Sequence, residues 1–258
     1  MTYQHEIETM LAAARNAGEL ALRHFNAGTI PQEKADLSPV TAADRECERL
    51  IQLMLSAAFP DDGIMGEEGT FKPSLSGRRW LIDPIDGTRD FIRGNCFWSV
   101  QIALEAEASG VMGAIYFPCL HRMLYAVDGQ GCYWDDSPVR HSGQTQLDKA
   151  ILMVSGFKAA WEAWPPDAVR QLTEKCWAVR SYGASYDIAV LARGQGDVWL
   201  SGSGMEWDYA AARVIARECG AKFLIRDGTD RIDARHCLIC PPGLERELRH
   251  ILRIPAAG

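Results

Sequence analysis

The sequence has no long apolar run and no excess of positive charge. A membrane-spanning helix needs roughly 20 consecutive apolar residues, so no such helix is expected. Asp and Glu number 34 against 27 Lys and Arg, which gives a net charge of −7. Nucleic-acid-binding surfaces need clustered basic side chains. We therefore expect neither a membrane nor a nucleic acid as a partner, although bound Mg²⁺ would still allow an acidic protein to take a phosphorylated substrate.

Paired cysteines and a leader segment are also missing. The eight cysteines are scattered singly, apart from Cys237 and Cys240 in one apolar run. Disulfide frameworks belong to short secreted chains, so the cysteines indicate a reducing compartment. We interpret Cys237 and Cys240 as buried core thiols, with metal or redox use as the alternative. The N-terminal residues lack the basic start and apolar stretch of a signal peptide. A cytoplasmic location is the expectation.

The apolar pattern changes once along the chain. Helical spacing predicts two amphipathic helices, one over residues 7–25 and one that begins near Thr41. Short apolar segments separated by turn residues then predict an antiparallel sheet, with strands at 79–83, 97–104, 111–117, 123–127 and 132–134. From about residue 148 strands and helices alternate. We predict an α+β fold of two lobes, residues 1–147 and residues 148–258.

Acidic residues occur at three element ends. They stand in Gly66-Glu67-Glu68-Gly69, in Asp83-Pro-Ile-Asp86-Gly87-Thr88 and in Trp207-Asp208. Any one of these alone is typical of a solvated turn or a helix cap. The second is more specific, because a strand delivers Asp83 from the interior and Gly87 lets the backbone approach a ligand. Two carboxylates beside free backbone N–H groups suit Mg²⁺ together with phosphate.

Other phosphate chemistries do not match the spacing. Two residues separate Asp83 from Asp86, whereas haloacid-dehalogenase-type phosphatases need Asp-x-Asp. The alternating acidic ligands of an EF-hand are absent. The sequence also has no P-loop and no Gly-x-Ser-x-Gly elbow. The six histidines never cluster, which argues against a histidine-based zinc site.

The three acidic motifs, in this order, resemble those of the inositol monophosphatase family of Mg²⁺-dependent, lithium-sensitive phosphomonoesterases. Segments 38–44 and 180–185 share the resemblance, which runs from the first predicted helix to about residue 240. It implies the layered sandwich of the sugar-phosphatase type, in which helices and sheets alternate. The first lobe would carry most metal ligands and the second would complete the site. A homodimer is also implied by the resemblance.

The family pattern implies a role for each matching position. A first Mg²⁺ would be held by Glu67, Asp83 and the Ile85 carbonyl, and a second by Asp83, Asp86 and Asp208. Glu67 would also anchor a third, weaker ion through water. Thr88 would orient the attacking water, with Asp44 accepting a hydrogen bond from its hydroxyl. The substrate-binding residues would be Asp86, Gly87, Thr88, Gly183, Ala184, Ser185 and Ser201.

The substrate is less clearly indicated than the chemistry. Inositol-specific members carry a Glu seven positions before the last metal-binding Asp, and here that position is Ser201. Loop segments 34–41 and 91–104 look more like the histidinol-phosphate phosphatases of the family. The sequence therefore favours histidinol phosphate, with inositol 1-phosphate and adenosine 3′,5′-bisphosphate as alternatives. The rival from another class is a catalytically silent regulator that binds metal or phosphate.

Overall fold

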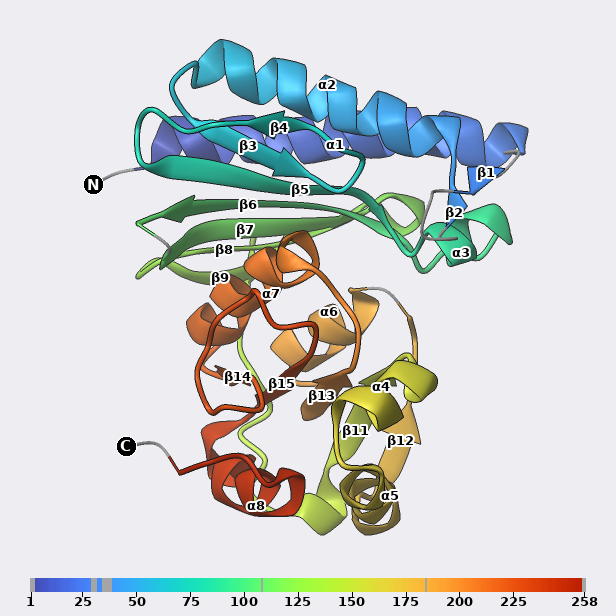
Figure 1. Ribbon diagram of the computed structural model, residues 1–258, viewed down its shortest axis with the longest axis vertical. Coiled ribbons are helices and arrows are strands. Elements are labelled where there is room, and N and C mark those ends of the chain that lie inside the picture. The colour runs from blue at the N-terminus through green and yellow to red at the C-terminus, as the bar shows by residue number, and fades with distance from the viewer. Residues whose placement is uncertain (1–2, 29–31, 34–38, 108, 184, 257–258) are drawn as a thin grey trace.

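The computed structural model describes residues 3–28, 32–33, 39–107, 109–183 and 185–256. Helices and sheets alternate along the long axis of the molecule (Figure 1). Helices α1 (Gln4–Ala27) and α2 (Ala42–Ala58) cover the outer face of an eight-stranded sheet. Helices α6 (Tyr186–Ala192) and α7 (Glu206–Glu218) separate it from a five-stranded sheet. This arrangement confirms the predicted α+β layered sandwich.

The eight-stranded sheet is mixed rather than purely antiparallel. Its strands lie in the order β10 (Ser137–Val139), β9 (Gly131–Trp134), β8 (Arg122–Val127), β7 (Ser109–Phe117), β6 (Ser99–Ala106), β5 (Arg78–Asp86), β3 (Gly63–Gly66) and β4 (Phe71–Lys72). Strands β3 and β5 run parallel, while the other neighbours are antiparallel. The parallel pair brings the ends of β3 and β5 to the same edge of the sheet, where the acidic motifs begin.

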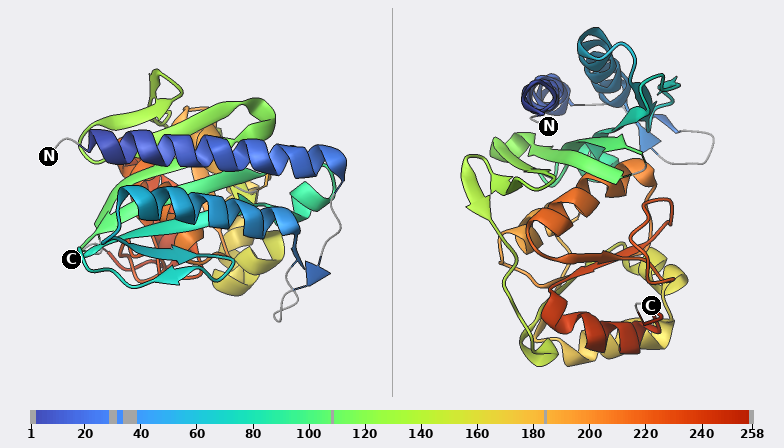
Figure 2. Two further views of the ribbon diagram at one scale, coloured as in Figure 1. Left: turned by 90° about the horizontal axis from the view of Figure 1, so that it is seen from above. Right: turned by 90° about the vertical axis from the view of Figure 1, so that its left-hand side faces the viewer.

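The five-stranded sheet is formed by the part of the chain in which strands and helices alternate. Its strands lie in the order β12 (Ala178–Arg180), β11 (Ile151–Ser155), β13 (Val198–Ser201), β15 (Cys237–Cys240) and β14 (Lys222–Leu224). Three helices lie on its far side, α4 (Phe157–Ala163), α5 (Pro166–Lys175) and α8 (Pro242–Leu252) (Figure 2). A two-stranded ribbon, β1 (Gln32–Glu33) with β2 (Pro39–Val40), precedes α2.

Three apolar cores hold these layers together. One lies between the two N-terminal helices and the eight-stranded sheet, and includes Ile51 and Trp80. A second lies between the two sheets around α6 and α7, with Ile188 and Ala211. The third lies beneath α5 and α8, where Leu172 and Leu248 are buried. The site described below is therefore built on packed elements rather than on free loops.

The predicted helices and most predicted strands are present with small shifts of their ends. One boundary is wrong in a way that affects the site, because β5 runs through Pro84 to Asp86 instead of stopping at Pro84. Proline has no N–H for the ladder, and the register of β5 against β6 shifts between Asp83 and Asp86 to accommodate it. Strands β1, β2, β3, β4 and β10 and helix α4 were not predicted.

Cys237 and Cys240 are buried, as predicted. Cys96 is exposed and Cys119 is half-buried, whereas the others lie in the cores, and all eight are free thiols. The change from the first sheet to the second falls between β10 and β11, on either side of residue 147. Whether 1–147 and 148–258 are separate folding units stays a prediction.

Within the described residues no helix is both long and apolar enough to span a bilayer.

Candidate active site

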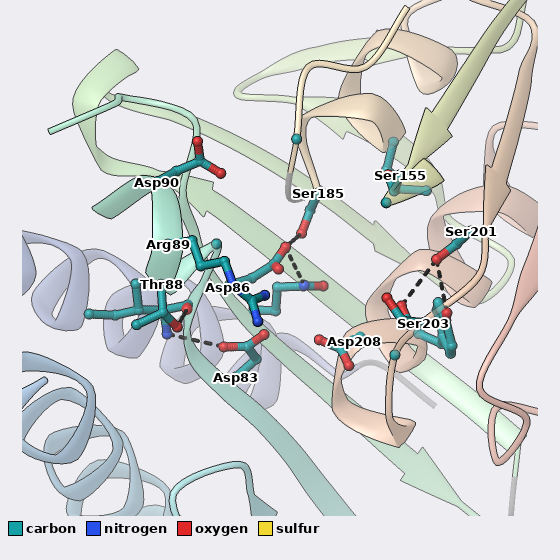
Figure 3. Close-up of a pocket in the computed structure, with 18 of the residues that line it drawn as sticks. Asp83, Asp86, Thr88, Arg89, Asp90, Ser155, Ser185, Ser201, Ser203 and Asp208 are labelled. Atoms are coloured by element: carbon teal, nitrogen blue, oxygen red, sulfur yellow. Dashed lines mark hydrogen bonds between the residues drawn. The ribbon is translucent and has the colours of Figure 1, made fainter. Parts of the chain in front are cut away.

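A cleft of about 390 Å³ lies between the two sheets. Its wall is made by the end of β5, by α3 (Thr88–Ile92), by β6, by the ends of β11 and β13, and by the first turn of α7. Figure 3 shows these side chains pointing into the cleft from both halves of the chain. The described lining residues include five acidic side chains and one basic side chain, Arg89.

Asp83, Asp86 and Asp208 meet at the floor of this cleft. Each offers a carboxylate oxygen, and the three oxygens lie within 4.8 Å of one another. The bulge in β5 is what turns both Asp83 and Asp86 toward the cleft, because two residues of a regular strand three positions apart would face opposite sides. Asp208 comes from α7, where its carboxylate also accepts a hydrogen bond from the Met205 backbone N–H.

These carboxyl groups repel one another. Burial raises the pKa of Asp83 well above its usual range, and the charges of Glu67 and Asp86 raise it further. Burial also raises the pKa of Asp86 to about 6, although a hydrogen bond from Ser185 opposes the shift. For Asp208 burial and the charge of Asp86 raise the pKa to about 7. The protein thus holds together acids that need a compensating positive charge.

A divalent cation fits this donor set. Hard cations such as Mg²⁺ prefer carboxylate and carbonyl oxygens, and Asp83, Asp86 and Asp208 supply three converging carboxylates. The one basic residue of the described lining, Arg89, cannot balance five acids. A phosphate dianion would be repelled by the cleft as it stands, so cations would both relieve the repulsion and attract the substrate.

Glu67 reaches the same cleft from the turn that follows β3. Its backbone N–H donates to the Ile82 carbonyl at 3.1 Å, which ties the turn to β5. Its carboxyl group shares a hydrogen bond with Asp83, and its charge raises the pKa of Asp83, Asp86 and Asp208. Glu67 therefore lies within electrostatic reach of the whole acidic cluster, as its predicted role requires.

The Ile85–Thr88 segment forms the other wall. The Ile85 N–H donates to Asp83 Oδ1 at 3.1 Å, and the Thr88 hydroxyl donates to the Ile85 carbonyl at 3.2 Å. Gly87 has a φ of +89°, a left-handed conformation that glycine adopts without strain, and it is the N-cap residue of α3. The carbonyl predicted as a metal ligand thus already accepts the Thr88 hydrogen bond.

Asp44, in the first turn of α2, does not line the cleft. Its Oδ2 accepts the backbone N–H of Thr41 at 2.8 Å and the Thr41 hydroxyl at 2.5 Å, so it caps the start of α2. Its Oδ1 is buried without a hydrogen-bond partner. Burial raises the pKa of Asp44, and the charge of Glu67 adds to the shift. The predicted hydrogen bond from Thr88 to Asp44 is not formed in this structure, where Thr88 donates to Ile85 instead.

The predicted alcohol side of the site is polar and tightly connected. Ser185 donates to Asp86 and hydrogen-bonds Ser99 at 3.2 Å. Ser201 lines the cleft, yet its hydroxyl donates to the Ser203 carbonyl at 3.2 Å. Gly183 also lines it, while Ala184 lies outside the described residues. These residues offer backbone and hydroxyl groups for hydrogen bonds to a substrate. Position 201 is a serine and offers no carboxylate.

Gln101 and Ser155 are among the polar cleft residues that sequence reasoning missed. Gln101 donates from β6 to Asp86 Oδ2 at 3.0 Å. Ser155, at the end of β11, donates to buried Asp187 at 2.7 Å. Gln101 had a signal in the sequence, because it is a polar residue within an otherwise apolar strand. Ser155 had none, since a serine at a strand end is common in any fold.

Asp90 is a further acidic residue of the lining. It lies on α3, apart from Asp83 and Asp208 (Figure 3). Asn95 donates to its Oδ1 at 2.6 Å, and a Cβ placed on Gly183 would lie 3.3 Å from its Oδ2. Partial burial raises the pKa of Asp90. Its carboxylate therefore lies on the side of the cleft near Gly183.

Comparisons with known proteins agree with this geometry. The histidinol-phosphatase of Chlorobaculum parvum is 37% identical over 216 residues, which is 83% of this chain and 83% of that protein. The histidinol-phosphatase of Mycobacterium tuberculosis is 33% identical over 228 residues, 84% of this chain and 86% of the relative. The crystal structure of the extragenic suppressor protein suhB from Bartonella henselae superposes with a TM-score of 0.88 at 25% identity, covering 97% of this chain and 99% of that one.

A model of the inositol monophosphatase family matches residues 3–253, nearly the whole chain. The matched range contains all three acidic motifs. The chain is thus a member of the inositol monophosphatase family and a phosphoric monoester hydrolase.

Proposed function

We propose that this phosphatase is Mg²⁺-dependent and hydrolyses a small phosphate monoester, with histidinol phosphate as its preferred substrate. The observation that carries the metal assignment is the convergence of Asp83, Asp86 and Asp208 within 4.8 Å in a cleft with excess negative charge. Glu67 and the Ile85 carbonyl would complete a set for two ions, with Glu67 anchoring a third, weaker one. When bound, these cations would neutralise phosphate charge, lower the pKa of water and stabilise the leaving alkoxide.

The protein's own groups would orient the reactants. The backbone N–H groups of Gly87 and Thr88 would donate to phosphate oxygens at the start of α3. The Thr88 hydroxyl would position the attacking water after leaving the Ile85 carbonyl, and the buried Asp44 Oδ1 is an acceptor in need of a partner. Apo hydrogen bonds at active sites often rearrange when substrate binds. Gly183, Ala184 and Ser185 would contact the alcohol.

The preference for histidinol phosphate rests on charge at the alcohol end. Histidinol carries a cationic amine, whereas inositol carries neutral hydroxyls. With the acids of the cleft floor engaged by cations, Asp90 would remain to pair with the amine. Two other acids near the motifs are less suited, because Glu206 pairs with Arg79 at 2.9 Å and neither it nor Glu68 lines the cleft. Two relatives named histidinol-phosphatase, at 37% and 33% identity, support the same subgroup.

The test is a phosphate-release assay with a panel of substrates at equal Mg²⁺. The panel contains histidinol phosphate, myo-inositol 1-phosphate, adenosine 3′,5′-bisphosphate and fructose 1,6-bisphosphate. We expect the highest kcat/KM with histidinol phosphate and no turnover in EDTA, with activity restored by Mg²⁺. Full activity in EDTA would contradict the metal assignment, and a better inositol ester would contradict the substrate.

The inositol ester is the second candidate, and Ser201 argues against it, because a hydroxyl that already donates to Ser203 is a poor replacement for an acidic contact to ring hydroxyls. A catalytically silent regulator would hydrolyse none of these esters, so phosphate release from any of them would reject it. We further propose that the enzyme works as a homodimer in the cytoplasm. Size-exclusion chromatography with light scattering and cell fractionation test these two points.

A further inference from the structure

A buried acid on α2 is bound to the turn that carries Glu67. Glu48 is 2% exposed and does not line the cleft. Its Oε2 accepts the backbone N–H of Glu68 at 2.7 Å, and its Oε1 accepts that of Thr70 at 2.9 Å. Both carboxylate oxygens are thus used to hold the residues that immediately follow Glu67.

The Glu48 carboxyl group packs directly against Gly66. A Cβ placed on Gly66 would lie 2.4 Å from the Glu48 carboxyl carbon and 2.5 Å from its Oε2. The glycine before Glu67 is therefore the residue that lets this carboxylate reach the turn. The turn is closed by a backbone hydrogen bond from Gly66 to the Thr70 carbonyl at 2.8 Å.

We propose that Glu48 is a positioning residue for Glu67: by clamping the 66–70 turn it fixes the direction of the Glu67 carboxylate and so sets the affinity of the cleft for Mg²⁺. The inference rests on the proposed function, in which Glu67 is a metal ligand. Hydrogen bonds from neutral donors to an ionised carboxylate are stronger than neutral pairs. Mg²⁺ demands near-ideal octahedral geometry, so a ligand on a loosened turn binds it poorly.

Two variants disrupt the hydrogen bonds between Glu48 and the 66–70 turn, one by changing Glu48 and the other by changing the turn. Glu48→Gln replaces one acceptor oxygen with a donor that faces a backbone N–H. Gly66→Ala keeps the charge of Glu48 and displaces its carboxylate through the new methyl group, which separates loss of the clamp from loss of a negative charge. Glu67→Gln is the direct ligand variant.

A matched control exists at another turn. The Glu218 carboxylate accepts the backbone N–H groups of Gly129 at 3.1 Å and Gly131 at 2.9 Å, and these residues lie outside the cleft lining. Glu218→Gln therefore removes the same kind of contact without touching the site. Any general effect of a weakened turn on the fold appears in this variant too.

The experiment measures Mg²⁺ binding to the full chain by isothermal titration calorimetry and amide hydrogen exchange of residues 66–70 in the metal-free protein. We expect Glu48→Gln and Gly66→Ala each to weaken Mg²⁺ binding roughly 10–100-fold, the usual effect of losing a group that orients a metal ligand. Exchange of the Glu68 and Thr70 amides should become faster. The double variant should be no worse than the weaker-binding single variant, because both act on one contact. Glu218→Gln should bind Mg²⁺ like the wild type.

Two results would contradict the inference, and they differ in what they mean for the proposed function. If Glu67→Gln weakens Mg²⁺ binding while Gly66→Ala and Glu48→Gln bind normally, the positioning role of Glu48 is overturned and the proposed function stands. If Glu67→Gln itself binds Mg²⁺ like the wild type, the ligand assignment in the proposed function fails, and the inference fails with it.

Discussion

Asp83 and Asp208 hold carboxylate oxygens within 4.8 Å of each other, although Asp83 belongs to the eight-stranded sheet and Asp208 to the first turn of α7. Their approach depends on how closely α7 rests on that sheet. At Gly113 of β7, a Cβ would lie only 2.6 Å from the Ala211 Cα. The convergence of these carboxylates therefore depends on small residues packed at the layer interface.

Replacing Asp208 by Asn should abolish turnover, because it removes a charged oxygen ligand from a cation that needs several. The fold should survive, and the metal-free variant should melt at a higher temperature than the metal-free wild type, since one repelling charge is gone. Phosphate release with Mg²⁺ and thermal unfolding in EDTA test both points. The exposed Asp148 offers a control, and Asp148→Asn should change neither. Wild-type turnover in Asp208→Asn would disprove the ligand assignment.

The metal-free protein should lose stability as the pH rises from about 4 to about 7. The folded-state pKa values of Asp86 and Asp208 are raised to about 6 and about 7, above the unfolded value near ~3.9. The folded state then binds more protons than the unfolded state in this window, so the free energy of unfolding falls with pH. Urea unfolding in EDTA across this range measures the loss. Saturating Mg²⁺, which binds the folded state, should largely remove it.

Much of this site follows from local sequence patterns. A strand followed by Asp83-Pro-Ile-Asp86-Gly87-Thr88 predicts a turn of carboxylates and backbone donors, because proline and glycine restrict what the chain can do there. The two-lobed α+β fold follows from the change between closely spaced strands and alternating elements, whereas the alternating layers were implied by the family resemblance. These patterns depend on neighbours in sequence, so they are visible without a structure.

The supporting contacts depend on tertiary packing and could not be predicted. Glu48 looks like a solvated acid on a helix, and its burial under the 66–70 turn becomes clear only once β3 is placed beside β5. The bulge at Pro84 could not be predicted either, because a proline that ends a strand and a proline within a bulge look alike in the sequence. The hydrogen bond from Thr88 to Ile85, in place of one to Asp44, is likewise a matter of three-dimensional geometry.

Thr88→Ala should lower kcat by at least ~10²-fold, the low end for a positioned proton-transfer group. The KM should change less, because the backbone donors of Gly87 and residue 88 remain. Thr88→Ser keeps the hydroxyl and should retain most activity. Steady-state kinetics with saturating Mg²⁺ separate the two parameters. A variant that loses affinity and keeps kcat would show that Thr88 binds phosphate or caps α3 rather than positions water.

Gly113→Ala should destabilise the protein by about 1–3 kcal/mol, the usual cost of overpacking a tight interface. The added methyl group meets backbone atoms of Ala211, which cannot move without shifting α7. Because α7 carries Asp208, Mg²⁺ binding should weaken as well. Urea unfolding and calorimetry give the two values. Ser109→Ala, at the exposed start of the same strand, should leave both unchanged.

Asp90→Asn should lower kcat/KM for histidinol phosphate about tenfold, or about 1.4 kcal/mol of transition-state binding. The reason is that the variant keeps the shape of the side chain and the contact with Asn95 and removes the charge that would face the amine. Myo-inositol 1-phosphate has no amine, so its kcat/KM should change by less than about twofold. Both esters are measured at equal, saturating Mg²⁺, which makes the inositol ester an internal control for the metal site. Equal losses for the two substrates would mean that Asp90 shapes the cleft without selecting the amine, and the charge argument for histidinol phosphate would then have no residue to support it.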